Sequence, residues 1–540
     1  MFRKRVLAVL ISTAVLLFGA FAINTYGFTS TDFLKTNGKT LRNNSGAGSV
    51  ITLRGANAGG WLVQESWMCP TDAVDQKTMI STFTSRFGAA TKDSLIKTYE
   101  DNWWTTADFD NCKNLGMNVL RLPFTYMNLL DSNGNLLSNA WTRLDWFVSN
   151  CNSRGIYVIL DLHGAPGSQN GADHSGDTSG ANLWTSTANQ DKTVWLWQQI
   201  ATHFKGNAAV AGYDLLNEPT GASGTTQWNF YDRIYRAVRA IDPDHVIFIE
   251  ATWEPTNLPS PSQYGWTNVV YEYHNYCWNA DNDFNTQKAF TDSKVNGVNA
   301  ANYNVPTFVG EFTCFTNMNT WDYDLKTYNA QGWSWTTWTY KTVGGGNWGL
   351  YNGTPSKVYI GSDSSSTIQS KWSTVGTAST FTKNTNLCNT FSTYVKGGVV
   401  FNNFDLNQGY SAGPNATVSY NSSGQNVMLT TTVSADPGNA NQCAKVVPQT
   451  GTSINASGYT YFTFWIDDTQ GNNTVKVTMV DTNNAVWSGW TSTASTKNVW
   501  VGLTLAMSGV TGINKAAIKE IRIGEWNSGT YYIDGLQFNN

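Results

Sequence analysis

The chain has 540 residues, which is too long for one ordinary domain. Its formal net charge is −4 and only 13% of its residues are charged, so composition argues against a nucleic-acid partner.

The N-terminus predicts a secretory signal over residues 1–22. Arg3–Arg5 is a basic start, Val6–Ile23 is an apolar run, and Ala20–Ala22 is a small-residue cleavage signature. The apolar run is also long enough to stay in place as a single membrane anchor. We expect cleavage and a secreted, extracellular protein, with no membrane partner beyond an uncleaved anchor.

Seven cysteines are an odd number for an oxidising compartment. Cys112 and Cys151 occupy equivalent positions of consecutive predicted helices, so they either form a disulfide or remain buried thiols. Cys277 and Cys314 follow consecutive predicted strands and could also pair. Because C-x-x-C spacings are absent, we expect no zinc site.

Residues 29–396 alternate strand-like and helix-like segments. Eight short apolar runs end at Ala58, Phe124, His163, Asn217, Ala251, His274, Glu311 and Trp338. Strand–helix alternation repeated eight times predicts an α/β fold, a closed parallel (β/α)8 TIM barrel.

Helix-period stretches lie between these runs, at Trp141–Arg154, Thr193–Phe204 and Gln227–Ile241. The last barrel helices are expected at Ser365–Val375 and Asn386–Val395. We interpret residues 61–100 as a long loop at the active-site face.

The pattern changes at residue 397, where helix periodicity stops. Short alternating runs separated by turn residues follow, at 427–433, 459–466, 475–480, 500–505, 518–523 and 531–538. This predicts an all-β, jelly-roll-like sandwich over residues 397–540. The junction lacks a Pro-rich or Ser-rich linker, so we expect the two domains to touch.

Two glutamates carry the predicted chemistry. Glu218 and Glu311 each follow an apolar strand, which places both carboxylates at the end of the barrel where active sites form. Enzymes that cleave glycosidic bonds usually need two carboxylates in one cleft. We expect Glu218 to act as acid and then base, and Glu311 to act as nucleophile.

Other strand-end residues have roles that fit this pair. Arg121 and Tyr276 could bond the nucleophile, and Asn217 could donate to the sugar 2-hydroxyl. His163 and His274 could bond sugar hydroxyls or orient a glutamate. Trp338 is the expected platform under the reacting sugar, with core packing as the alternative.

Two longer strings are the segments Arg54–Trp67 (RGANAGGWLVQESW) and Asp161–Gly171 (DLHGAPGSQNG). With the glutamate motifs, they make residues 35–395 resemble glycoside hydrolase family 5 of clan A, closest to its exo-β-1,3-glucanase branch. In that clan the acid/base and nucleophile end strands four and seven.

The resemblance also implies that Glu65 and Asp173 bind the terminal glucose. The pocket would then be closed beyond the sugar residue that is cleaved off. The chain departs from the branch at His174, where asparagine is usual, and in an apparent extra residue between Trp333 and Lys341.

The C-terminal region resembles a carbohydrate-binding module in its layout and its Tyr531–Phe538 ending. Trp487, Trp490 and Trp526 are candidate sugar platforms, because they occur among polar and turn residues; core packing is the alternative for each. Asp405 and Asp534 could share a structural calcium ion.

The sequence thus predicts a retaining β-glucan hydrolase that releases glucose from β-1,3-glucan. Its partner is a β-glucan polysaccharide or oligosaccharide, it needs no catalytic metal or other cofactor, and we expect a monomer. The alternatives are an endo-β-1,4-glucanase of the same family and a non-catalytic glucan-binding surface protein.

Overall fold

The computed structural model describes residues 27–402, 404, 407–422, 426–434, 442–449, 451–471, 474–493 and 497–539. The expected signal, residues 1–22, and Asp405 of the expected calcium pair lie outside these residues. Within the described ranges, none of the helices combines the length and the apolar character needed to cross a membrane.

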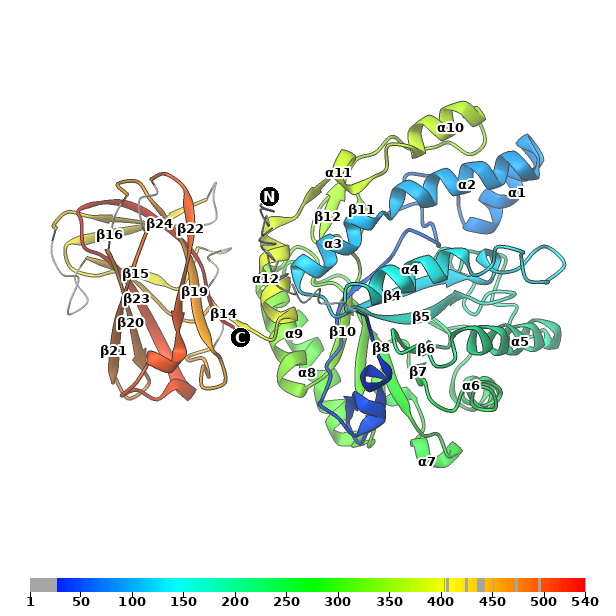
Figure 1. Cartoon of the computed structure of the whole chain (residues 1–540), viewed down its shortest axis with the longest axis horizontal. Helices are drawn as coiled ribbons and strands as arrows, with labels where there is room; N and C mark the ends of the chain where they lie inside the picture. Colours follow the sequence, from blue (N-terminus) through cyan, green and yellow to red (C-terminus); the bar gives the residue numbers. More distant parts are fainter. Residues whose placement is uncertain are drawn as a thin grey trace, which may run out of the picture.

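Eight parallel strands close into a barrel in the order β10-β3-β4-β5-β6-β7-β8-β9, which confirms the predicted TIM barrel (Figure 1). The strands are β3 (Arg54–Asn57), β4 (Val119–Thr125), β5 (Tyr157–Gly164), β6 (Val210–Asp214), β7 (Val246–Glu250), β8 (Val269–Asn275), β9 (Thr307–Phe312) and β10 (Ser334–Thr337). Their sequences are continuous apolar runs because both faces of the sheet are buried: helices cover its outside and side chains fill its inside.

Helices connect the strands and cover the barrel. They are α3 (Thr106–Leu115), α4 (Thr142–Asn152), α5 (Thr187–Phe204), α6 (Gly224–Arg239), α7 (Pro261–Tyr264), α8 (Phe284–Ala301), α9 (Met318–Gln331) and α12 (Thr385–Val395). In α6, Phe230, Ile234 and Val238 recur every four residues and are buried, so one face of the helix packs on the barrel.

The expected long loop over residues 61–100 is wrong in its second half. Residues 76–103 form helices α1 (Gln76–Phe87) and α2 (Ala89–Trp103), and α10 (Ser365–Trp372) packs against α2. The ring centroids of Phe83 and Tyr99 lie 5.7 and 5.2 Å from that of Trp372, so aromatic contacts hold these helices together and join them to the main core.

Two small sheets complete the barrel region. Strands β1 (Lys35–Asn37) and β2 (Thr40–Arg42) form a hairpin, and β11 (Lys341–Val343), β12 (Tyr351–Gly353) and β13 (Phe381–Lys383) form a second sheet. The short helix α11 (Thr377–Thr380) leads into β13.

The C-terminal region is built from antiparallel strands, as expected (Figure 1). One sheet has the order β16-β17-β24-β19-β22, with β14 beside β24, and the other has the order β15-β18-β23-β20-β21. The strands are β14 (Val399–Asn402), β15 (Tyr410–Ala412), β16 (Ala416–Asn421), β17 (Asn426–Thr431), β18 (Cys443–Val446), β19 (Tyr461–Asp468), β20 (Thr474–Asp481), β21 (Val486–Ser492), β22 (Trp500–Ala506), β23 (Ile518–Glu525) and β24 (Gly529–Asn539).

The expected short runs did not include strand β21. Trp487 and Trp490 lie on this strand, which is at the edge of its sheet and carries a serine and a glycine between the two tryptophans. Trp490 is exposed, whereas Trp487 packs partly against the core.

The barrel and the sandwich contact each other directly. Strand β14 follows α12 after three residues, the Thr393 hydroxyl of α12 donates to Gln537 of β24, and Gln449 donates to Asn319 of α9 at 3.3 Å. The last barrel helix is therefore packed against the final strand of the chain.

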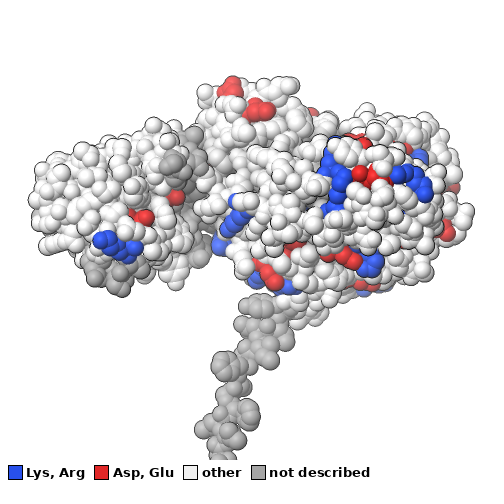
Figure 2. Space-filling model, turned by 90° about the horizontal axis from the view of Figure 1, so that it is seen from above, with Lys and Arg blue, Asp and Glu red and all other residues white. Residues whose placement is uncertain are grey.

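All seven cysteines are free thiols, so neither of the two considered disulfides forms. On the face drawn in Figure 2, charged side chains are few and occur in small mixed groups, and most of the surface is neutral. A neutral surface suits an uncharged polymer better than a polyelectrolyte.

Candidate active site

The two predicted glutamates meet at the carboxyl ends of the barrel strands. Glu311 lies on β9, the seventh barrel strand, and Glu218 lies four residues after the end of β6, the fourth. The predicted strand reached Asn217, but β6 ends at Asp214. One carboxylate oxygen of Glu218 and one of Glu311 lie within 4.8 Å of each other. This is the short separation that retaining glycosidases use; inverting pairs stand about 6.5–9.5 Å apart.

Glu311 has the environment of an ionised carboxylate. Arg121 donates from Nη1 to its Oε1 at 2.8 Å, and the Tyr276 hydroxyl donates to its Oε2 at 2.9 Å. Burial raises the pKa of Glu311, and the Arg121 guanidinium acts in the opposite direction. Both predicted partners of the nucleophile are in place.

Glu218 is buried, and within the described part of the chain neither a lysine nor an arginine forms an ion pair with it. His274 Nδ1 lies 2.7 Å from its Oε1, and His174 Nε2 lies 3.2 Å from its Oε2. Burial lowers the pKa of His174 to about 4 and holds the pKa of His274 well below its ordinary value, so both rings are neutral. Burial and the Glu311 charge raise the pKa of Glu218 well above its ordinary value. A proton shared by the pair therefore resides on Glu218.

The backbone of Glu218 is held in an unusual conformation. Its φ of 43° lies in the left-handed region, which costs a non-glycine residue about 1–2 kcal/mol. Oε2 of Glu250, the last residue of β7, accepts the Glu218 N–H at 2.7 Å. Glu250, which the sequence interpretation missed, thus holds the Glu218 backbone from the neighbouring strand.

Asn217 is oriented by Arg121 and keeps a free donor. Its Oδ1 accepts from Arg121 Nη2 at 2.9 Å, while its buried Nδ2 has no hydrogen-bond partner. An unmatched buried donor is costly, so this amide is suited to a polar group of the substrate. The geometry fits the predicted bond to the sugar 2-hydroxyl.

Arg121 also contacts three buried carboxylates beneath the site that the sequence interpretation missed. Its distances are 2.8 Å to Asp214, 3.1 Å to Asp161 and 3.4 Å to Glu272. Burial raises the pKa of Asp161 and of Asp214 to about 7. Gly310 leaves space for the Glu272 side chain because it has no Cβ. A Cβ at position 310 would lie 1.6 Å from Glu272 Oε1. A side chain at position 310 would therefore displace the Glu272 carboxylate.

His163 and Trp338 form a stacked pair at the mouth of the barrel. Their ring centroids are 5.4 Å apart with planes 9° from parallel, and His163 Nδ1 lies 2.7 Å from Asp161 Oδ2. Burial lowers the pKa of His163 to about 3, so it is neutral. Trp338 is 4% exposed and belongs to a cluster with Met68, Cys69 and Tyr276. It is therefore well packed, and it also lies beside Tyr276, which donates to Glu311.

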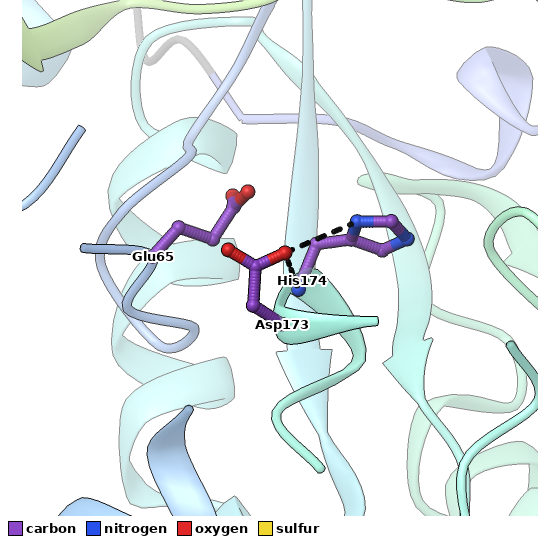
Figure 3. Close-up of side chains that lie close together, drawn as sticks. All are labelled: Glu65, Asp173 and His174. Carbon is purple, nitrogen blue, oxygen red and sulfur yellow. Dashed lines mark hydrogen bonds and ion pairs between the residues drawn. The ribbon is translucent and has the colours of Figure 1, made fainter. Parts of the chain in front are cut away.

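Glu65, Asp173 and His174 converge from two different loops (Figure 3). One carboxylate oxygen of Glu65, one of Asp173 and one ring nitrogen of His174 all lie within 4.8 Å of one another. Trp67 donates to Glu65 Oε2 at 2.8 Å, while Glu65 Oε1 is buried without a partner. Burial raises the pKa of Glu65 to about 8. An unmatched carboxylate oxygen here is suited to a sugar hydroxyl.

An aromatic rim borders Tyr276, which donates to Glu311. Trp278 stacks on Tyr276 at 5.4 Å and contacts Trp348 and Phe315 at 5.9 and 5.5 Å. The rings of Trp278, Phe315 and Trp348, together with residues 279–283, line a wide, open depression. Trp348 also contacts Trp67, the donor to Glu65, at 4.9 Å, so the rim adjoins the group formed by Glu65, Asp173 and His174.

Among the described residues, three groups have the spacing of metal ligands: Glu65 with Asp173 and His174, Glu218 with His274 and Glu311, and Glu250 with Glu272 and His274. The second group contains both predicted catalytic carboxylates, whose hydrogen bonds to Arg121, Tyr276 and His274 already account for their orientation.

The pKa directions predict a bell-shaped pH profile of kcat/KM. Activity falls at low pH when Glu311 takes up a proton, and at high pH when Glu218 loses its own. Because the pKa of Glu218 is raised, the alkaline limb is expected well above pH 4.5, its ordinary value. Rates on an aryl glycoside measured across pH test this. An alkaline limb near pH 4.5 would contradict the proposed proton location.

Comparisons with known proteins find a family model and several relatives that match part of this chain. A family model described as Cellulase (glycosyl hydrolase family 5) matches residues 75–344. A β-xylosidase from Phanerodontia chrysosporium is 32% identical over 249 residues, 45% of this chain and 52% of that protein. A glucan 1,3-β-glucosidase from Candida oleophila is 32% identical over 255 residues, 42% of this chain and 58% of that protein. The chain thus spans about half the length of these relatives.

Among solved structures, an endogalactoceramidase aligns over 93% of this chain and 100% of its own, with 14% identity and a TM-score of 0.48.

Proposed function

The chain belongs to glycosyl hydrolase family 5, and we propose that it is a retaining β-glucan hydrolase acting by double displacement. The observation that carries this proposal is the Glu218–Glu311 pair. Its carboxylates are within 4.8 Å, and only Glu311 is bonded to an arginine.

In the first step, Glu311 attacks the anomeric carbon and the glycosidic C–O bond breaks. Glu218 gives its proton to the departing oxygen, and a covalent glycosyl-enzyme forms on Glu311. In the second step, Glu218, now a carboxylate, takes a proton from water. That water attacks the anomeric carbon and releases Glu311, so the sugar leaves with its original configuration. These steps use no metal or other cofactor.

The favoured substrate is β-1,3-glucan, with release of the terminal glucose. Glu65 and Asp173 support this proposal, because they bring carboxylates together on one side of the catalytic pair. Relatives named as glucan 1,3-β-glucosidases support the linkage. A panel of β-1,3-, β-1,4-, β-1,6- and mixed-linkage glucans with product sizing tests both points. Glucose from laminarin at the earliest times is expected.

Glu65→Ala is expected to lower kcat/KM on laminarin strongly. Removing one partner of a buried hydrogen bond costs about 1–3 kcal/mol, which corresponds to roughly 5- to 150-fold. Glu65→Gln keeps one acceptor and should lose less. Steady-state rates on laminari-oligosaccharides measure the difference. Unchanged kinetics in Glu65→Ala would remove this residue from the sugar pocket.

An endo-β-1,4-glucanase is the enzymatic alternative, favoured by the open aromatic rim at Trp278 and Trp348. It would give an early ladder of oligosaccharides from a β-1,4-glucan. A non-catalytic glucan-binding protein is the alternative of another class. It offers no reason for two buried carboxylates so close together, of which Glu311 alone is bonded to Arg121.

We also propose secretion, action as a monomer, and a sugar-binding role for the sandwich. Trp465 supports that role better than the predicted platforms. It lies on β19 and is 48% exposed. Its ring covers Gly502 of β22 and Gly535 of β24: a Cβ added at these glycines would lie 3.3 and 3.2 Å from the indole. The indole therefore lies across neighbouring strands of the sheet with area left for a sugar ring.

Trp465→Ala is expected to weaken binding to insoluble β-1,3-glucan about tenfold, since an apolar contact of about 1.4 kcal/mol is lost. Its rate on soluble oligosaccharides should not change, because the barrel holds the catalytic groups. Pull-down isotherms with Trp490→Ala as the matched control measure this. Equal binding by wild type and Trp465→Ala would exclude this surface.

A further inference from the structure

A buried glutamate at one end of the sandwich has no role in the proposed hydrolysis. Glu525 ends strand β23 and pairs in register with Val475 of β20. Like Ile521 and Ile523 on the same strand, it is fully buried between the two sheets. Its side chain therefore points into the sandwich rather than toward solvent.

Neither carboxylate oxygen of Glu525 has a hydrogen-bond partner. No lysine, arginine or histidine among the described residues forms an ion pair with it. An unpaired carboxylate in an apolar interior is costly, and buried charges are normally paired or bound to a metal. Burial and the charge of Asp468 raise the pKa of Glu525 well above its ordinary value.

A second buried carboxylate faces the same end from the opposite sheet. Asp468 is the last residue of β19 and is 1% exposed. Its Oδ2 accepts from the Thr493 hydroxyl at 2.8 Å, and its Oδ1 accepts from the Gln470 N–H at 2.8 Å. Thr493 follows β21 and is itself fully buried, so it joins the two sheets at this end.

We propose that Glu525 and Asp468, with the Thr493 hydroxyl beside them, form a binding site for one calcium ion. Calcium takes six to eight oxygen ligands, including carboxylates that bind through one or both oxygens. Two carboxylates supply a charge of −2 that matches the ion, and each carboxylate oxygen has a lone pair beyond its present bonds. The ion would connect β19 of one sheet to β23 of the other.

This site differs from the calcium pair expected from the sequence. Asp534 pairs in register with Trp465, whose ring is exposed, whereas Asp468 pairs with the buried Tyr531. Successive side chains of a strand point to opposite faces, so Asp534 and Asp468 face opposite sides of the sheet. Asp534→Asn is therefore a matched control for loss of a carboxylate in the same domain.

Calorimetry of the full chain tests the proposal, with calcium or a chelator present. In wild type, saturating calcium is expected to raise the Tm of one transition by about 5 °C, because an ion that binds only the folded state stabilises it. Glu525→Gln and Asp468→Asn should each lose this response, and Asp534→Asn should keep it.

Terbium luminescence on wild type gives a readout that needs no variant. Trp526 directly follows Glu525, so excitation of tryptophan should sensitise a bound terbium ion, and calcium should quench the signal by competition. Two results would overturn the proposal. One is a wild-type Tm and terbium signal that do not respond to calcium, and the other is an undiminished calcium response in a folded Glu525→Gln or Asp468→Asn.

Discussion

Glu311→Gln is expected to lower kcat on every glycoside by about 10⁴-fold or more, because loss of a nucleophile removes the covalent path itself. The substitution keeps the side-chain size and can still accept from Arg121, so the fold should be preserved. Substrate affinity should change little. Single-turnover rates and calorimetric binding of a laminari-oligosaccharide separate the two effects.

A matched control is Glu520→Gln, which changes the same residue type on the sandwich and should leave kcat unchanged. Mass spectrometry of wild type with a slow 2-fluoro glycoside should find the sugar on the peptide that contains Glu311. Near-normal turnover in Glu311→Gln, or a label on another residue, would remove Glu311 from the nucleophile role.

Glu218→Ala is expected to show a different pattern. Turnover of glucan should fall about 10²- to 10⁴-fold, the usual contribution of general acid–base catalysis. An aryl glycoside with an activated leaving group needs no proton for departure, so its first step should persist and the glycosyl-enzyme should accumulate. Azide can enter the space that the side chain vacates, attack the anomeric carbon and restore turnover.

The product of that rescue is a glycosyl azide with the same anomeric configuration as the substrate, which NMR identifies. Glu311→Ala provides the contrast: azide would attack there from the opposite face and give the other anomer. A Glu218→Ala variant that azide does not accelerate, and whose loss is equal on activated and natural substrates, would contradict its role as acid/base.

The barrel and the catalytic pair could be predicted because their signals are local. Each catalytic glutamate follows a short apolar run, and parallel strands bring their carboxyl ends to one edge. Helices α1 and α2 were missed although Met79 with Phe83, and Leu95 with Tyr99 and Trp103, carry the four-residue spacing of a buried helix face.

The missed carboxylates show where local signals end. Glu250 ends an apolar strand just as the catalytic residues do, so the same rule could have found it. Its role depends on the left-handed backbone of Glu218, which follows the neighbouring strand β6, and no sequence spacing reveals that conformation. Asp161, Asp214 and Glu272 are explained only by the position of Arg121 among them.

The central claim is that Glu218 and Glu311 act together in a double displacement. The most direct test is ¹H NMR of the first sugar released by wild type from a β-linked substrate, recorded before mutarotation. The short separation of the two carboxylates predicts that the β-anomer appears first. Initial appearance of the α-anomer would mean single displacement by water and would contradict the claim.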